Sequence, residues 1–134
     1  MKILGIDFGQ RKIGLAITEG FLAQPLGIVS ISNIKNKQSL LLRNKILNIC
    51  QRQEIEKIVV GLPEGRLATE VKKFASQLGK LTDLPVEFQD ETLTSQEAVA
   101  KMREIGKKLK DEDAIAAALI LQSYLDTQSR KTPS

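Results

Sequence analysis

The stretch Ile3-Leu4-Gly5-Ile6-Asp7-Phe8-Gly9-Gln10-Arg11-Lys12-Ile13-Gly14-Leu15-Ala16-Ile17 decides the fold of this chain. Two almost continuously apolar runs, residues 3–8 and 13–17, flank a short polar link, which predicts two adjacent strands joined as a hairpin. The first run is apolar on both faces of its alternation until Asp7 interrupts it. A strand of that kind is buried on both sides, so we expect it at the centre of a sheet.

The sequence outside this hairpin predicts strands alternating with helices. A third strand is expected over 26–31, because Gly20 and Pro25 break the chain before it. Helical spacing of apolar residues predicts helices over 37–52 and 67–78, and short β-branched or apolar runs predict strands over 57–60 and 85–88. Thr94 and Glu97 form a capping box for a helix that ends at Gly106, and a last helix is expected over 111–126.

This order predicts an α/β fold with a five-stranded mixed sheet and helices on both faces. The 134 residues contain no internal repeat or linker and suffice for one hydrophobic core. We therefore expect a single domain over residues 1–126 and a polar, frayed C-terminal tail over residues 127–134.

The composition excludes several chemistries. The chain has no histidine, so a Ser-His-Asp triad, a Cys-His pair and a His-ligated zinc site are all absent. Carboxylates or lysines must therefore do the work of any enzyme here. Cys50 is the only cysteine and lies in the apolar repeat of a predicted helix, so we expect a small buried hydrophobe and not a nucleophile. A single cysteine also fits a reducing compartment.

The composition is compatible with a polyanionic partner, although a charge balance of this size is also common in proteins that have none. No apolar run is long enough to span a bilayer and the N-terminus lacks a signal-peptide layout, so the expected localisation is cytoplasmic, without a membrane partner. The net charge is +4, with one tyrosine, four phenylalanines and no tryptophan. Nucleic acid contacts would therefore rest on phosphates more than on base stacking.

Three acidic groups are candidates for chemistry: Asp7, the pair Asp90-Glu91 after a strand, and Asp111-Glu112-Asp113 at the start of the last helix. Strand ends and helix starts converge on one edge of an α/β sheet, where ligands bind. Two of the groups also have a structural explanation, since Asp7 can make a turn with Gly9 and Asp111 can cap its helix. If the groups gather, a divalent cation such as Mg²⁺ or Mn²⁺ would relieve their repulsion and support phosphodiester hydrolysis.

The motifs of this chain resemble those of the YqgF family, also called RuvX. The resemblance rests on residues 5–16, on Val59-Val60-Gly61-Leu62-Pro63, on Asp90-Glu91-Thr92-Leu93-Thr94-Ser95, and on residues 113–126, in the family's order and spacing. It implies an RNase H-like fold related to the RuvC resolvases. It also implies a metal-dependent cytoplasmic endonuclease that acts on RNA in 5′-end maturation of 16S ribosomal RNA, the family having earlier been proposed to resolve Holliday junctions.

Carried over by motif, the family's acidic cluster falls on Asp7, Glu91 and Asp113, as catalytic residues and as ligands of Mg²⁺ or Mn²⁺, with the neighbouring Asp111 as a further candidate ligand. Two departures affect substrate handling. Thr92 stands where family members usually have arginine, and the loop after Gly61-Leu62-Pro63 is shorter than is common.

Several functions stay open at the level of sequence. The residues Asp7-Phe8-Gly9 with Gly14 also resemble the first phosphate loop of actin-like ATPases, but those enzymes use two copies of the fold. A Holliday junction resolvase, which would act as a dimer on DNA junctions, is also compatible with the motifs, as is an inactive nucleic-acid-binding module. A monomer is favoured, because the predicted apolar stripes are used within one sheet. Five basic residues are expected to bind phosphates at the acidic edge, although each could be a solvated loop residue: Arg11, Lys12, Lys107, Lys108 and Lys110.

Overall fold

The computed structural model describes residues 1–9, 12–30, 36–91, 100–104 and 112–131. Its elements, in chain order, are β1 (Ile3–Phe8), β2 (Lys12–Glu19), β3 (Leu22–Ser30), α1 (Asn36–Arg52), β4 (Lys57–Leu62), α2 (Arg66–Thr82), β5 (Val86–Asp90) and α4 (Glu112–Lys131). Residues 100–104 are also helical.

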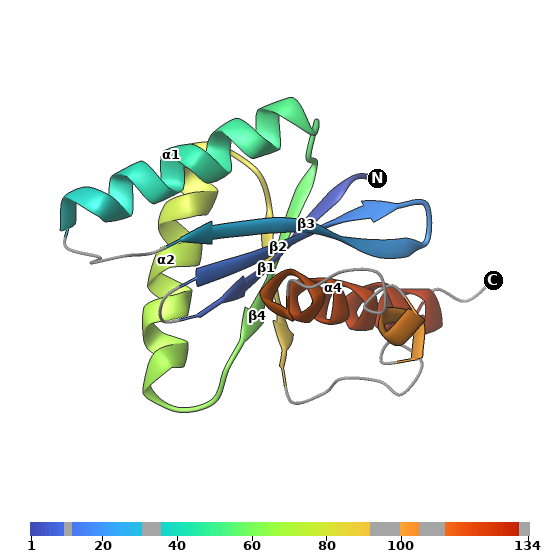
Figure 1. Cartoon of the computed structure of the whole chain (residues 1–134). Coiled ribbons are helices and arrows are strands. Elements are labelled where there is room, and N and C mark those ends of the chain that lie inside the picture. Colours follow the sequence, from blue (N-terminus) through green and yellow to red (C-terminus); the bar gives the residue numbers. More distant parts are fainter. Residues whose placement is uncertain (10–11, 31–35, 92–99, 105–111, 132–134) are drawn as a thin grey trace.

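The five strands form one mixed sheet in the order β3-β2-β1-β4-β5 (Figure 1). Strand β1 pairs antiparallel with β2 and parallel with β4, and β4 pairs parallel with β5. The central place of β1 is confirmed, and it explains why that strand is apolar on both faces.

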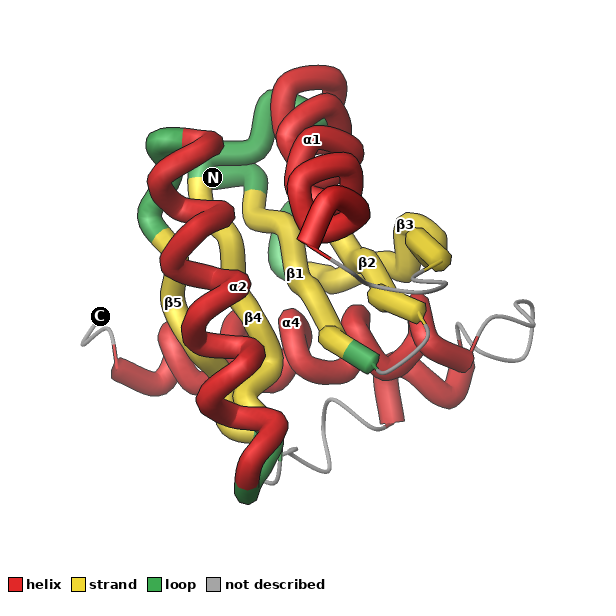
Figure 2. The backbone as a smooth tube through the Cα atoms, turned by 90° about the vertical axis from the view of Figure 1, so that its left-hand side faces the viewer, coloured by secondary structure: helices red, strands yellow, loops and turns green. Residues whose placement is uncertain are grey.

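Helices cover both faces of the sheet, as predicted. Helices α1 and α2 lie on one face and α4 lies on the other (Figure 2). Side chains of β1 alternate between the two layers: Leu4 and Ile6 join the core under α1 and α2, whereas Ile3 joins the core under α4. In the described part of the chain, no helix has the length and apolarity to span a bilayer.

Cys50 belongs to the core under α1 and α2, and only 4% of its surface is exposed. Burial raises the pKa of its thiol to about 11, so the sulfur stays protonated at neutral pH. The expectation of a small buried hydrophobe is confirmed.

The third strand begins earlier than predicted, because it starts before Pro25 and continues through it. Strand β3 begins at Leu22, and Pro25 lies within it, paired with Ala16 next to a register shift between Leu15 and Ala16. Proline lacks a backbone N–H and is tolerated only on edge strands or at bulges. Because β3 is an edge strand, Pro25 marks the edge of the sheet and not a connection.

The last helix is also longer than predicted. Helix α4 continues to Lys131, whereas the sequence pattern predicts its end at Asp126 and a frayed tail from residue 127. No glycine or proline interrupts the sequence before Pro133, so the helix has no local reason to stop earlier. Residues 132–134 lie outside the described residues, as do most of the predicted helix at 94–106 and its capping box.

Candidate active site

Asp7 is the penultimate residue of the central strand and belongs to the face covered by α4. Strand alternation places it on the same face as Ile3, which packs under α4. Its partner on β2 is Gly14, and the preceding residue Ile6 pairs with Val60 on β4. Asp7 therefore lies between two neighbouring strands at the carboxyl end of β1, and it is half-buried.

Glu91 reaches Asp7 from the end of β5. Its backbone N–H donates to the carbonyl of Leu62 over 3.2 Å, which fixes it beside the end of β4. Gly61 then provides space, since a Cβ at this position would lie 2.9 Å from Oε1 of Glu91. The carboxyl groups of Glu91 and Asp7 form a side-chain hydrogen bond. Two acids 84 positions apart in the sequence thus meet at one edge of the sheet.

Asp113 lies in the first turn of α4, and Gly14 determines where that turn sits. A Cβ on Gly14 would lie 1.9 Å from the backbone carbonyl oxygen of Asp113, a separation that no side chain could tolerate. The helix can therefore approach β2 directly at the residue that pairs with Asp7, because Gly14 has no side chain. From this position the charge of Asp113 acts on Asp7.

The electrostatics of the three acids are those of a crowded, partly desolvated carboxylate group. The pKa of Glu91 is raised to about 7, first by burial and then by the hydrogen bond to Asp7 and the charges of Asp7 and Asp90. Burial and the charge of Asp113 raise the pKa of Asp7, while the hydrogen bond from Glu91 lowers it. In the hydrogen bond between the two groups, Glu91 is therefore the proton donor and Asp7 the acceptor.

The donor set suits a hard divalent cation. Asp7, Glu91 and Asp113 offer only carboxylate oxygens, which Mg²⁺ and Mn²⁺ prefer, and a pair that shares a proton can exchange it for a cation. Within the described residues, no three acidic or sulfur-bearing side chains are already arranged around one point as a finished metal site. The chemistry of the three residues fits a cation, while their present contact is the direct bond between Asp7 and Glu91.

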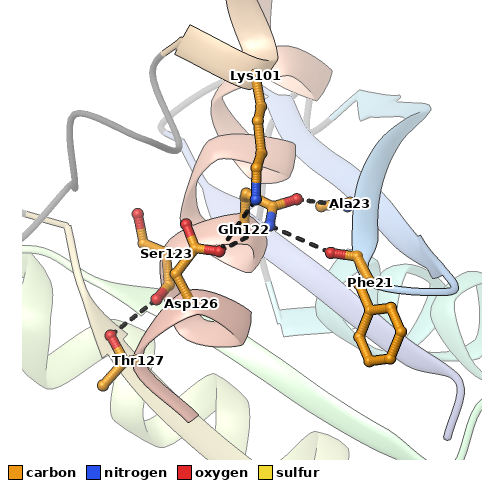
Figure 3. Close-up of polar contacts among 7 residues, drawn as sticks. All are labelled: Phe21, Ala23, Lys101, Gln122, Ser123, Asp126 and Thr127. Carbon is orange, nitrogen blue, oxygen red and sulfur yellow. Dashed lines mark hydrogen bonds and ion pairs between the residues drawn. The ribbon is translucent and has the colours of Figure 1, made fainter. Parts of the chain in front are cut away.

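A buried amide holds α4 in register over the sheet (Figure 3). Gln122 is fully buried; its Oε1 accepts from the backbone N–H of Ala23 at 2.8 Å and its Nε2 donates to the carbonyl of Phe21 at 3.3 Å. The same Nε2 donates to Oδ1 of Asp126 at 3.0 Å, and Lys101 forms an ion pair with that oxygen at 3.3 Å. These bonds tie α4 to the β2–β3 hairpin, and so support the position of Asp113 at the other end of the helix.

A second polar group anchors α4 to the other half of the sheet. The hydroxyl of Tyr124 donates to Glu87 of β5 and accepts from Nζ of Lys57 of β4 at 3.1 Å. Lys57 also pairs with Glu87 at 3.1 Å. Both contacts raise the pKa of Lys57, which keeps its ammonium charged. Helix α4 is thereby fixed to strands on both sides of β1.

The predicted phosphate-binding residues fall only partly within the described residues. Lys12 is exposed and begins β2, two positions before Gly14. The remaining members of that prediction, and the neighbouring acid, lie outside the described residues: Arg11, Lys107, Lys108, Lys110 and Asp111.

The residues that support the acids are not identified as such by the sequence motifs. Gly14 and Gly61 appear there only as parts of longer matches, although a glycine inside a strand is a known sign of close approach by another segment. Gln122 also appears there only as part of a longer match. It follows the apolar Leu121 in a helix with an alanine-rich inner stripe, and a polar residue in such a position signals a buried hydrogen-bonding role.

Solved structures with the same fold include nucleic acid resolvases. Thermus thermophilus RuvC, solved in complex with a Holliday junction substrate, matches with a TM-score of 0.70 and 14% sequence identity over 98% of this chain and 97% of that chain. The fowlpox virus resolvase, solved with Holliday junction DNA, matches with a TM-score of 0.58 and 14% identity over 96% of this chain and 99% of that one. These likenesses confirm the RNase H-like fold of the RuvC resolvases.

Sequence comparison is more specific. A protein of Protochlamydia amoebophila named "Putative pre-16S rRNA nuclease" is 40% identical over 95% of this chain and 94% of its own length. A protein of Streptococcus mutans with the same name is 35% identical over 94% of this chain and 98% of its own. A family model described as "RuvX: Holliday junction resolvase" matches residues 1–127. The chain therefore belongs to the RuvX family.

Proposed function

We propose that this chain is a divalent-metal-dependent endonuclease that cuts precursor 16S ribosomal RNA during maturation of its 5′ end. The observation that carries the proposal is the meeting of Asp7 and Glu91, with Asp113 beside them, at the carboxyl end of the central strand. The names of the relatives in Protochlamydia amoebophila and Streptococcus mutans support the choice of substrate.

Asp7, Glu91 and Asp113 would hold Mg²⁺ or Mn²⁺, which when bound supplies Lewis acidity toward the phosphate and a more acidic water. The residues themselves have separable roles. Strand β1 is paired with a strand on each side, so the backbone of Asp7 holds a fixed position in the site. In the metal-free protein Glu91, with a pKa of about 7, shares a proton with Asp7 near neutral pH, and this proton would be released when the carboxylates take up the cation. Asp113 adds charge from the first turn of α4.

The basic residues near this edge would hold phosphate oxygens of the RNA on either side of the cut. Lys12 is exposed and lies two residues from Gly14, which pairs with Asp7. Arg11, Lys107, Lys108, Lys110 and the neighbouring acid Asp111 remain predictions for the same edge. Thr92 lacks the charge of the usual arginine, so we expect phosphate binding to depend more on these lysines.

The experiment that tests this function compares cleavage of a pre-16S rRNA fragment by the purified protein with Mg²⁺, with Mn²⁺ and with EDTA. We expect cutting with either metal, none in EDTA, and none by the Asp7→Asn variant. Equal cutting in EDTA would contradict metal dependence. The absence of cutting under all conditions, with intact RNA binding, would favour an inactive binding module.

The second candidate, Holliday junction resolution, is favoured by the description of the family model and is tested in parallel. A resolvase cuts two strands related by a two-fold axis and needs two sites at a fixed spacing. Cleavage of a mobile four-way DNA junction is therefore assayed in parallel with cleavage of the RNA. Paired symmetric nicks in the junction by a stable dimer, with the RNA spared, would reverse the assignment.

A further inference from the structure

The two helices on one face of the sheet carry a large net positive charge, because they contain many basic residues and a single acidic one. Helices α1 and α2 contain eight of the 20 basic residues and one of the 16 acidic residues, so they hold a net charge of +7 and the rest of the chain holds −3. Because both helices cover the same side of the sheet (Figure 2), their positive charges are brought together on one face of the molecule.

The charges point outward from that face. The buried side of each helix is apolar and packs on the sheet, as for Ile46 of α1 and Val71 of α2. Six basic side chains of the two helices are exposed and form what we call the basic helix face: Lys45, Arg52, Arg66, Lys72, Lys73 and Lys80. In the part of the chain that the structure describes, none of the six forms an ion pair.

The spacing of these residues suits an extended partner. Lys45 and Arg52 are seven positions apart on α1, and Arg66, Lys73 and Lys80 repeat the same interval on α2. Seven residues are close to two helical turns, so each series lies along one stripe with successive charges about 10 Å apart. Two rows of regularly spaced, solvated cations attract a linear polyanion more strongly than a small ligand.

The basic helix face begins next to the candidate active site. Arg66 opens α2 four positions after Leu62, and the carbonyl of Leu62 accepts the backbone hydrogen bond of Glu91. Asp7 lies on the face covered by α4, so a strand of nucleic acid would pass from the acidic edge around the end of β4 and then onto α2.

We propose that the basic helix face is a second binding surface, for the phosphate backbone of structured RNA, that holds the substrate away from the bond to be cut. The proposal rests on the proposed function only for the choice of RNA among polyanions. An acidic protein fits the face less well. Protein interfaces depend on buried aromatic anchors, and Phe74, the one aromatic residue of the two helices, is 7% exposed and points into the core.

Binding of a fluorescent RNA hairpin in EDTA, measured by anisotropy over a range of salt concentrations, tests this surface without any cleavage. The paired variants Lys72→Gln/Lys73→Gln and Lys45→Gln/Arg52→Gln each remove two charges from it. A matched control, Lys2→Gln/Arg103→Gln, removes two charges elsewhere. Thermal melts verify that all three remain folded.

We expect each variant of the face to lower the slope of log K against log salt by about 1.4–1.8, which corresponds to two lost phosphate contacts, and to weaken binding about 25- to 60-fold near 0.1 M salt. The control should change the slope by less than half as much. Equal loss in the control would mean that only net charge matters, and an unchanged slope in both face variants would place RNA elsewhere; either result overturns the proposal.

Three further outcomes separate this surface from the proposed function and from a protein partner. Loss of RNA binding in the face variants of a protein that cuts no RNA would support the surface and reject the nuclease. Normal cutting and normal RNA affinity in those variants would reject the surface alone. If a polyglutamate peptide binds the wild type more tightly than the hairpin does, and the face variants lose only that binding, the partner is an acidic protein and the RNA proposal fails.

Discussion

Replacing Gly14 with alanine tests how the candidate site is assembled. The new Cβ would lie 1.9 Å from the carbonyl oxygen of Asp113, whereas ordinary contact begins at 3.4 Å, so the first turn of α4 must move by about 1.5 Å. The neighbouring atom belongs to the backbone and cannot rotate away. Insertion of a methyl group into a packed region costs about 1–3 kcal/mol, and we expect a value of about 2–3 kcal/mol here.

This cost has two measurable consequences. For a chain of 134 residues, 1 kcal/mol corresponds to about 4 °C in Tm, so differential scanning calorimetry should show a decrease of about 8–12 °C. Asp113 moves relative to Asp7, and a displacement of about 1 Å in such a site reduces turnover by about 100-fold. RNA cleavage should therefore fall by at least that factor at a temperature where the variant is folded.

Gly79→Ala in α2 is the matched control. Its Cβ would lie 3.2 Å from a methyl group of Val86, which can adjust, and alanine is favoured over glycine inside a helix by about 1 kcal/mol. We expect an unchanged or slightly higher Tm and normal cleavage. If Gly14→Ala keeps the wild-type Tm and activity, then α4 does not depend on Gly14, and our account of how Asp113 is brought beside Asp7 is wrong.

The remaining predictions concern the acids, the buried amide that positions α4, and the oligomeric state. Asp7→Asn should abolish cleavage yet melt in EDTA at or above the wild-type temperature, because it removes repulsion from Asp113 and keeps an acceptor for Glu91; a large loss of stability would instead make Asp7 a structural residue. The pKa of Glu91 is raised by folding from 4.5 to about 7, so its contribution to stability is complete below about pH 4.5 and is lost as the pH rises through about 7. The Tm of wild type in EDTA should fall over that interval relative to Glu91→Gln, and parallel curves for the two proteins would contradict the shifted pKa. Gln122→Leu leaves the buried N–H of Ala23 without its acceptor and should lower stability by about 1–3 kcal/mol in urea denaturation, whereas a neutral result would show that this amide does not hold α4. Light scattering should give a monomer, and a stable dimer would count in favour of Holliday junction resolution.

Most of the fold could be predicted from the sequence because the signals involved are local. The apolar alternation of residues 3–8 indicates a strand buried on both faces, and that strand is the central β1. Helical periodicity locates α1 and α2 to within a few residues, since each helix buries one stripe against the sheet. The start of the third strand is predicted wrongly because proline ends an inner strand but is tolerated on an edge strand, and only the strand order shows which of these applies to Pro25.

The identity of the candidate acids can also be predicted from the sequence, through motifs, but the contacts between them cannot. At the level of sequence, Asp7, Glu91 and Asp113 are separate residues, and a turn or a helix cap could account for an acid at such a position. The hydrogen bond between Asp7 and Glu91 depends on the parallel register of β1, β4 and β5, which brings distant strand ends to one edge. Their roles in catalysis stay a prediction until the variants are assayed.

By itself, the sequence determined which segments fold as strands and helices, and which chemistries are absent, because these follow from residue types and their periodicity. Only the tertiary structure decided that Gly14 admits the first turn of α4, that Gly61 admits Glu91, and that the positive charges of α1 and α2 share one face. Such contacts join residues far apart in the chain, and their geometry is set by strand register and layer packing, which no local pattern of residues specifies.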